Sequence, residues 1–392
     1  MNSWRRTFKK FLPPVTKTLF MEPFDTILPA DSVEFCPHPD ATNIFVCGTY
    51  KLEQSPDASP DEGDDGPMRV EARPQKRHGK CLVFDVNSTE EKGFSKIQEI
   101  YLPAILDMKW CHTSRSRTPL LAIADSEGQI TLHEWDLDQK QLKQTAHVPC
   151  ASPDVLCLSL DWSNRKSPTS TVGSLVVSLS NGCLALLQPD NESGLSLTDT
   201  WAAHDYEPWI AAWDYWDTNI IYSGGDDLKM KMWDVRQGFH QPAVTNKRFD
   251  AGVTTIQSHP HVEHIIAVGS YDNTVRVFDN RKLLTPLTKA DVNGGAWRVK
   301  WHPSPKRQHD LLVACMHDGF KVVRFRDIWQ GNDVPVTTSG EKWDVIERFD
   351  KHTSLAYGVD WSYAGLYGPD EPAQTLVASA SFYDHAMYLW HG

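Results

Sequence analysis

Three aromatic residues, Trp209, Trp297 and Tyr357, are the first candidates for chemistry in this sequence. Each stands four positions before the tryptophan that ends a short apolar segment, so the three occupy one place in a repeated pattern. When the first segment is aligned on its His-Pro end, Val33 takes this place. Aromatic rings that gather at one point can form a ligand site, and the alternative is that they pack between neighbouring elements.

Charged residues follow the aromatic positions at fixed steps. In the same alignment, Glu34, Asp107 and Arg298 come one position after the aromatic place. Lys109, Asp161, Lys300 and Asp360 come two positions later still. If the segments surround a channel, its wall is polar and carries charge of both signs.

Standard catalytic motifs do not occur. The sequence has no GxSxG, HExxH, Gly-rich phosphate loop or CxxC pair, which by itself favours an interaction scaffold. The net charge of -12 argues against a general nucleic-acid binder. Eight cysteines and no apolar leader indicate reduced thiols in a cytoplasmic protein, and no stretch is apolar enough for a membrane span.

The elements that position these residues are repeats. The clearest repeat is residues 201–236, "WAAHDYEPWIAAWDYWDTNIIYSGGDDLKMKMWDVR", which predicts three strands, the last of which ends in Trp-Asp. Residues 249–281 repeat this pattern, with a period of 45 residues from Asp234 to Asp279. Weaker copies bring the count to seven. The pattern predicts an all-β, seven-bladed WD-repeat β-propeller that occupies residues 15–392 as a single domain.

Three segments need separate treatment. The last blade lacks an outer strand, so we expect "VTKTLFME" (15–22) to supply it and close the ring. Residues 1–14, which include "WRRTFKKF", are expected to be a flexible basic leader. The Pro-, Gly- and charge-rich segment 54–79 is expected to be a disordered insertion.

Two sets of polar residues fit a structural role. In such blades a loop His, a turn Asp and a strand Trp form a hydrogen-bonded set that fixes the turn. The sequence offers two such sets: His204, Asp227 and Trp233; and His352, Asp384 and Trp390.

Five motifs together resemble one family: "SGGDDLKMKMWDVR", "GSYDNTVRVFDNR", "GGAWRVKWHP", "ACMHDGFKVV" and "SFYDHAMYLW". In this order and spacing they are similar to the WD-repeat family of diphthamide biosynthesis, the diphthine methyl ester hydrolases, over roughly residues 15–392. The resemblance implies a protein methylesterase that removes the methyl ester from methylated diphthine on translation elongation factor 2, giving diphthine and methanol.

The same resemblance implies a monomeric cytoplasmic enzyme without cofactor or metal, with the elongation factor as its partner and with no direct nucleic-acid contact. The alternative is a non-catalytic WD-repeat scaffold that docks the elongation factor for another modifying enzyme.

The implied substrate suggests roles for the aromatic residues. Diphthine carries a trimethylammonium group, which aromatic faces hold well. Trp209, Trp297 and Tyr357 are therefore expected to bind it, with Glu34 or Asp107 as the nearby negative charge.

Ester hydrolysis also implies a base and an oxyanion donor. His317, with Asp318 as its orienting group, is the expected base, and His385 is the second choice. Arg298 is expected to stabilise the oxyanion. The nucleophile is expected to be water, with the Cys315 thiolate as the alternative; His317 could instead only hydrogen-bond within its own blade.

Overall fold

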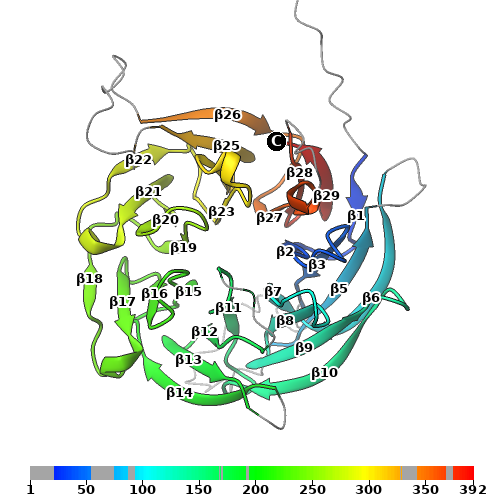
Figure 1. The fold of residues 1–392 in the computed structure, drawn as a ribbon, viewed down its shortest axis with the longest axis horizontal. Coiled ribbons are helices and arrows are strands. Elements are labelled where there is room, and N and C mark those ends of the chain that lie inside the picture. The colour runs from blue at the N-terminus through cyan, green and yellow to red at the C-terminus, as the bar shows by residue number, and fades with distance from the viewer. Residues whose placement is uncertain are drawn as a thin grey trace, which may run out of the picture.

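Seven antiparallel sheets surround a central axis (Figure 1). The computed structural model describes residues 22–53, 75–86, 93–166, 168, 171–190, 194–326, 328, 342–367 and 374–392. Within these ranges the only helices are short 3-10 turns, at Val235–Gln237, Asn280–Lys282, Pro305–Arg307 and Ala364–Tyr367. The prediction of an all-β seven-bladed propeller is confirmed.

The blades follow one another along the chain, each with its innermost strand first. The first has β2 (Ala30–Phe35), β3 (Ile44–Thr49), β4 (Lys51–Leu52), β5 (Arg77–Asp85) and β6 (Ser95–Pro103); the second has β7 (Ile105–Cys111), β8 (Leu120–Asp125), β9 (Gln129–Asp136) and β10 (Gln141–Pro149). The third has β11 (Cys157–Trp162), β12 (Leu175–Leu179), β13 (Cys183–Gln188) and β14 (Ser196–Ala202); the fourth has β15 (Ile210–Trp213), β16 (Ile220–Gly224), β17 (Met230–Asp234) and β18 (Val244–Asn246).

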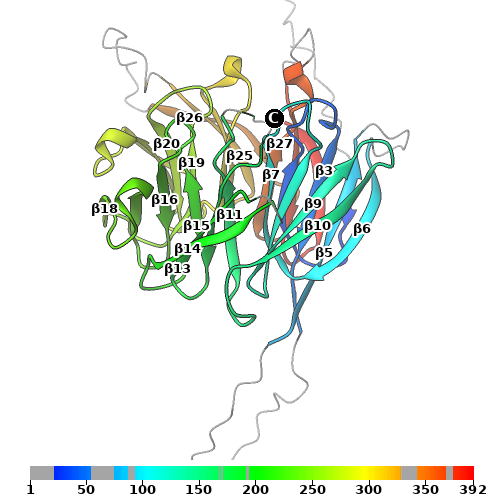
Figure 2. The same ribbon diagram turned by 60° about the horizontal axis from the view of Figure 1, so that its bottom comes forward.

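The later blades repeat this order. The fifth has β19 (Val253–Ser258), β20 (Ile265–Ser270), β21 (Thr274–Asp279) and β22 (Thr288–Asp291); the sixth has β23 (Arg298–Trp301), β24 (Asp310–Ala314), β25 (Phe320–Phe325) and β26 (Trp343–Phe349); the seventh has β27 (Ala356–Trp361), β28 (Leu376–Ser381), β29 (Ala386–His391) and β1 (Phe24–Asp25). Figure 2 shows the strands running between the two ends of the ring. No helix in the described ranges is long and apolar enough to span a membrane.

The inner strands bury both of their faces. In β11, Leu160 and Trp162 enter an apolar cluster shared with the second blade. Ser159 and Asp161 alternate with them and accept backbone N–H groups from β15 of the fourth blade, at 2.9 Å each. The period of two along a strand thus joins apolar packing on one side to hydrogen bonding on the other.

An N-terminal strand closes the ring, as expected, but at different residues. β1 pairs antiparallel with β29 through Phe24 and Asp25, and the two strands lie side by side in Figure 1. The Phe24 ring meets Phe84 of the first blade edge-on, with centroids 5.0 Å apart. Residues 15–21 of the expected strand lie outside the described residues, and Glu22 is not in a strand. The leader 1–14 also lies outside them.

The insertion is shorter than the sequence suggested. Residues 54–74 lie outside the described residues, but 77–79 belong to β5, so the expected boundary at 79 is wrong. His78 pairs with Lys51 on one side and with Pro103 on the other. A Cβ at Gly79 would come within 2.1 Å of the Thr49 carbonyl oxygen, so close backbone packing explains a glycine in what reads as loop sequence.

The two predicted polar sets are present. In the fourth blade, Trp233 donates to Ser223 Oγ at 2.9 Å, and His204 bonds to Ser223 at 2.7 Å and to Asp227 at 2.8 Å. Ser223 therefore connects Trp233 to His204 by hydrogen bonds, a connection that the sequence pattern did not predict.

The seventh blade has the same arrangement with two serines. Trp390 donates to Ser379 Oγ at 3.1 Å, and His352 bonds to Ser379 at 2.9 Å and to Ser381. Ser381 in turn donates to Asp384, so Asp384 reaches His352 through a hydroxyl.

Closure can be tested by two truncations. Removal of residues 1–27 deletes β1 and leaves the β29 edge unpaired, so we expect aggregation and a lower melting temperature. Removal of residues 1–21 retains β1 and serves as the matched control. If the shorter truncation already lowers the melting temperature as much, the closing contact includes residues before Glu22.

The fourth-blade set predicts a stability effect. Ser223→Ala leaves the Trp233 and His204 nitrogens buried without a partner, so we expect a loss of about 1–3 kcal/mol in the free energy of unfolding. Chemical denaturation measures it, and Ser196→Ala on the exposed strand β14 is the control. Equal stability of the two variants would contradict a structural role for this set.

Candidate functional site

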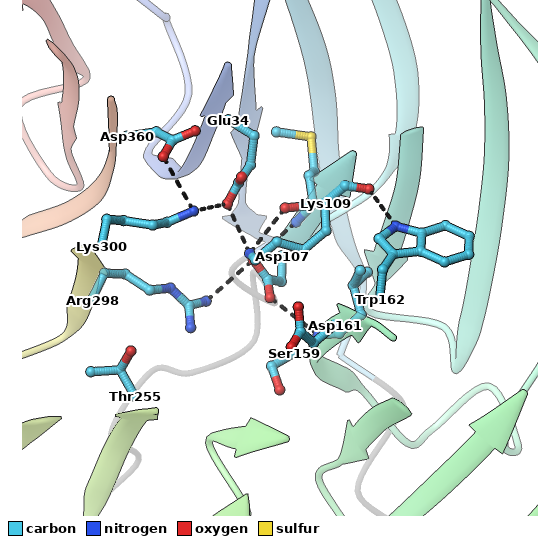
Figure 3. Close-up of polar contacts among 12 residues, drawn as sticks. Glu34, Asp107, Lys109, Ser159, Asp161, Trp162, Thr255, Arg298, Lys300 and Asp360 are labelled. Atoms are coloured by element: carbon cyan, nitrogen blue, oxygen red, sulfur yellow. Dashed lines mark hydrogen bonds and ion pairs between the residues drawn. The ribbon is translucent and has the colours of Figure 1, made fainter. Parts of the chain in front are cut away.

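The channel interior is filled by an ion network (Figure 3). Lys109 Nζ lies 2.6 Å from Asp107 Oδ1 and 2.8 Å from Glu34 Oε1. Lys300 Nζ lies 2.5 Å from the same Glu34 oxygen and 3.5 Å from Asp360. The channel therefore carries both signs of charge, as expected, but its charges neutralise one another.

The network favours the ionised forms of Glu34 and Asp107. Burial alone would raise the pKa of Glu34, yet the ammonium groups of Lys109 and Lys300 hold that pKa below its usual value. Burial likewise opposes ionisation of Asp107, and Lys109 and Arg298 hold its pKa low. Glu34 and Asp107, expected as partners of a ligand cation, are thus already paired with lysines inside the channel.

The three aromatic residues do come together at one mouth of the channel. Trp297 stacks on Tyr357 with centroids 4.8 Å apart, and Trp209 meets Trp297 edge-on at 5.5 Å. They line a pocket of about 220 Å³, to which Tyr271 and Phe382 add further rings. Since the facing sides of Trp297 and Tyr357 cover each other, their edges and outer faces form the wall. Their role in binding stays a prediction.

The motif "GGAW" places Trp297 at this mouth. A Cβ on Gly294 would lie 2.1 Å from the Cys315 carbonyl oxygen, and one on Gly295 would lie 2.8 Å from Met316 Sδ. The two glycines let the chain pass close to the neighbouring turn before β23 begins. The Trp297 N–H then bonds to the Ala314 carbonyl at 2.8 Å, which fixes the ring at the start of the strand.

Asp31 also lines the aromatic pocket, although the sequence pattern did not predict it there. Its side chain is 7% exposed, and its Oδ1 has no hydrogen-bond partner in the described part of the chain. Burial raises the pKa of Asp31 to about 7, and Arg298 opposes that rise. A buried carboxylate with an unbonded oxygen beside aromatic rings is a ready site for a cation.

A β-bulge explains why Asp31 was missed. β2 pairs with β3 through Ala30 and Ser32, so Asp31 is the extra residue of a bulge. β7, β11 and β19 shift register at the same place, around Leu106, Leu158 and Thr254. Asp31 is therefore the counterpart of these residues.

The alignment of the first segment on its His-Pro end, which put Val33 there, is wrong by two positions. Phe35 takes the place of the strand tryptophan in this blade. Glu34 is accordingly the counterpart of Lys109, and the bulges turn the residues of this ring toward the pocket.

Arg298 links the pocket to the channel. Its guanidinium lies 3.6 Å from Asp107 and its Cζ lies 5.7 Å from the Trp297 ring centre. It lines the same pocket as Asp31. The pocket thus combines aromatic walls, one carboxylate and one guanidinium, which suits a small zwitterion.

The residues expected for acid–base chemistry lie in a neighbouring hollow of about 660 Å³. His317 is exposed there, but Asp318 bonds to Lys321 and, at 3.0 Å, to Arg348. Asp318 is therefore engaged by cations and does not orient His317. Tyr383 lines this hollow and contacts Phe382 of the aromatic pocket, with ring centroids 5.0 Å apart.

The other two candidates are set apart. His385 sits in the β28–β29 turn with φ of 55°, and its carbonyl accepts the Thr26 N–H at 2.9 Å, so it belongs to the ring closure. Cys315 is fully buried, and burial raises the pKa of its thiol to about 12. Both features argue against the alternative of a Cys315 thiolate nucleophile. All eight cysteines are unpaired, and the described residues contain no cluster of metal-ligating side chains.

Comparisons with known proteins identify relatives. The chain is 38% identical over 363 residues to "Diphthine methyltransferase" of Mus musculus, which covers 91% of this chain and 71% of that protein. It is 34% identical over 388 residues to "Diphthine methyltransferase homolog" of Dictyostelium discoideum, covering 92% and 96%. A scan against protein-family models finds no match.

A solved structure agrees in fold. A chain described under "Crystal Structure of Mitotic Checkpoint Complex" superposes with a TM-score of 0.64 at 15% identity and covers 100% of this chain and 99% of that one. At this identity the likeness supports the propeller fold alone.

The relatives correct the expected reaction. The resemblance implied a carboxylic ester hydrolase that removes a methyl group, whereas the relatives are named for methyl transfer, the opposite direction. The expectations of a methylesterase and of methanol as a product are therefore wrong. The link to diphthine holds, and by identity and coverage the chain belongs to the diphthine methyltransferase family of WD-repeat proteins.

Proposed function

We propose that this chain takes part in methyl transfer on diphthine and that the aromatic pocket binds the diphthine side chain of translation elongation factor 2. The observation that carries the proposal is Asp31, a buried carboxylate whose Oδ1 accepts no hydrogen bond in the described part of the chain, set among aromatic rings. The name of the relatives supplies the reaction class.

The pocket suits the cationic end of diphthine. A trimethylammonium group has no N–H to donate, so ring faces and a nearby negative charge are its best partners, at roughly 0.5–2 kcal/mol per ring contact. Trp209, Trp297 and Tyr357 supply rings, and Asp31 supplies the charge. In this proposal Asp31 takes the part expected of Glu34 or Asp107, because those two are held by Lys109.

Arg298 suits the carboxylate of the same side chain. A guanidinium binds a carboxylate through two parallel hydrogen bonds, and the contact of Arg298 with Asp107 is long, at 3.6 Å. The quaternary nitrogen of diphthine has no lone pair, so of its two charged groups the carboxylate is the one able to accept a methyl group. Arg298 would hold and orient that carboxylate.

A second candidate function is a docking platform that presents diphthine to another enzyme. Two observations favour it. The pocket, at about 220 Å³, has the size of one modified side chain, and its lining contains neither His nor Cys. In that case the methyl donor would arrive on a partner protein.

The reaction can be followed by mass spectrometry. Purified chain is incubated with diphthine-bearing elongation factor 2 and S-adenosylmethionine, and we expect the modified peptide to gain the mass of one methyl group. A gain only after a second enzyme is added would favour the docking platform. A loss of that mass, or binding no tighter than that of unmodified factor, would contradict the proposal.

Ring-face binding predicts a graded mutational series. Trp297→Ala and Tyr357→Ala should weaken binding of the modified factor by roughly tenfold, while Trp297→Phe and Tyr357→Phe should cost less because a ring face remains. Loss of buried aromatic bulk can also destabilise the fold. Trp201→Ala, on the outer strand β14, is therefore the matched control and should lower stability without weakening binding.

Ionisation of Asp31 predicts a pH dependence. Because its pKa is raised to about 7, the carboxylate becomes charged as the pH rises through that value, and affinity for a cation should rise with it. Burial raises the pKa of Tyr271 and Tyr357, so neither tyrosine ionises in this range. Calorimetric titration with tetramethylammonium from pH 6 to 8 measures the effect. Asp31→Asn should flatten the profile, and an unchanged profile would show that another group titrates.

A further inference from the structure

We propose that the opposite mouth of the channel binds a small anion, a carboxylate or phosphate carried on a ring-sized body, with Arg165 as its main ligand. This site is separate from the pocket proposed for diphthine. It lies where the inner strands end: Arg165 follows the last residue of β11, and Leu158 near the start of that strand lines the aromatic pocket.

A cavity of about 230 Å³ opens at this mouth. Arg165, Lys166 and His112 lie in its wall, and Tyr215 and Tyr363 contribute aromatic surface. Among the residues that the structure describes, no carboxylate belongs to the lining. Cationic and aromatic groups therefore surround a space of about the size of one substituted ring.

Arg165 is the central observation. Its side chain is 8% exposed, and its one hydrogen-bond contact in the described part of the chain joins Nη1 to Asp161 Oδ1 at 3.5 Å. A guanidinium has five N–H donors, so most of those of Arg165 have no acceptor in the described part of the chain. Because Arg165 lines the cavity, these donors are available to a ligand bound there.

The negative charges nearby are committed elsewhere. Asp161 accepts the Trp213 N–H at 2.9 Å, and Glu34 and Asp360 face Lys300. Burial raises the pKa of Asp161, which weakens it further as a counter-ion. Among the described residues, Arg165 thus pairs with Asp161 alone, through a long contact of 3.5 Å.

The rim adds groups of the right kind. Lys166 Nζ lies 3.7 Å from the Trp216 ring centre and donates to the Pro260 carbonyl at 3.2 Å, which holds an ammonium at the entrance. Burial lowers the pKa of His112, so its ring is neutral and offers an N–H. The Arg165 Cζ lies 5.4 Å from the Tyr215 ring centre, so the guanidinium is fixed against an aromatic face.

The ion network separates the two mouths. The hollow between them measures about 30 Å³ and is lined by Lys109, Asp161, Arg298 and Lys300. A side chain or a ring cannot pass this point. A ligand at the Arg165 mouth therefore binds independently of a cation at the aromatic mouth.

The experiment uses phenyl phosphate and benzoate as probes, titrated calorimetrically into the purified full chain, with benzyl alcohol as the uncharged control. We expect both anions to bind and the alcohol not to bind. Arg165→Gln should weaken binding by roughly tenfold or more. Arg165→Lys should have intermediate affinity, because it keeps the positive charge but loses the planar pair of N–H donors that a guanidinium offers to an anion. Arg281→Gln, at an exposed arginine on the outer part of the fifth blade, is the matched control and should change nothing.

Two further variants guard against a folding defect. If Arg165→Gln melts early, Lys166→Gln and Tyr363→Phe test the same mouth while leaving the Arg165–Asp161 contact intact, and each should weaken binding. Tetramethylammonium should not compete with the anions, and Trp297→Ala should not affect them. Competition by tetramethylammonium, equal affinity in the Arg165 variants, or binding of benzyl alcohol as tight as that of benzoate would overturn the proposal.

Discussion

Several neighbouring blades are held together by buried polar side chains that accept backbone N–H groups from the adjacent blade. Asp360 accepts from Phe35 at 2.8 Å, Asp107 from Leu160 at 3.1 Å, and Asp161 from Trp213 at 2.9 Å. The strand tryptophans return the contact, as Trp162 Nε1 does to the Lys109 carbonyl at 2.9 Å. Inner strands of different blades share no sheet ladder, so these bonds satisfy groups that would otherwise be buried alone.

These hydrogen bonds between blades determine which side chains fill the channel. A carboxylate buried between blades must be paired with a cation, because an unpaired one would cost several kcal/mol. Lys109 of the second blade and Lys300 and Arg298 of the sixth supply the cations, and their side chains converge on the axis. The network therefore serves the fold first, and it closes the channel to anything larger than water. Binding chemistry is left to the two mouths, and these differ: Asp31 lies among rings at one, and Arg165 at the other.

The sequence predicted the parts of the site that follow the repeat and missed those that break it. Trp209, Trp297 and Tyr357 stand at equivalent places, so alignment alone brought them together. Asp31 was not predicted as a pocket residue because a bulge adds one residue to β2, and because Phe35 stands where other inner strands end in tryptophan. The burial of Cys315 and the engagement of Asp318 by Lys321 depend on contacts between strands, which local sequence does not encode.

The sequence did not predict the direction of the reaction correctly, and the reason is different. The aromatic rings and Asp31 would contact the trimethylammonium group of diphthine, which is the same before and after methylation of the carboxylate. A recognition site of this kind binds the reactant and the product of either direction. Only the named relatives distinguish them, so the aromatic mouth supports the choice of diphthine and leaves the choice of methyl transfer to the comparisons.

The contact between the first and last blades both closes the ring and forms part of the aromatic mouth. Tyr357 and Gly358 lie where β27 shifts register, and a Cβ on Gly358 would lie 2.9 Å from the backbone of Ser32, next to Asp31. The last blade therefore approaches the first closely just where the two contribute Tyr357 and Asp31 to the same pocket. β1 holds this seam from outside by pairing with β29 and packing Phe24 on Phe84. Asp31 and Tyr357 can share a ligand only in the closed ring, so the N-terminal strand positions the pocket as well as covering an edge.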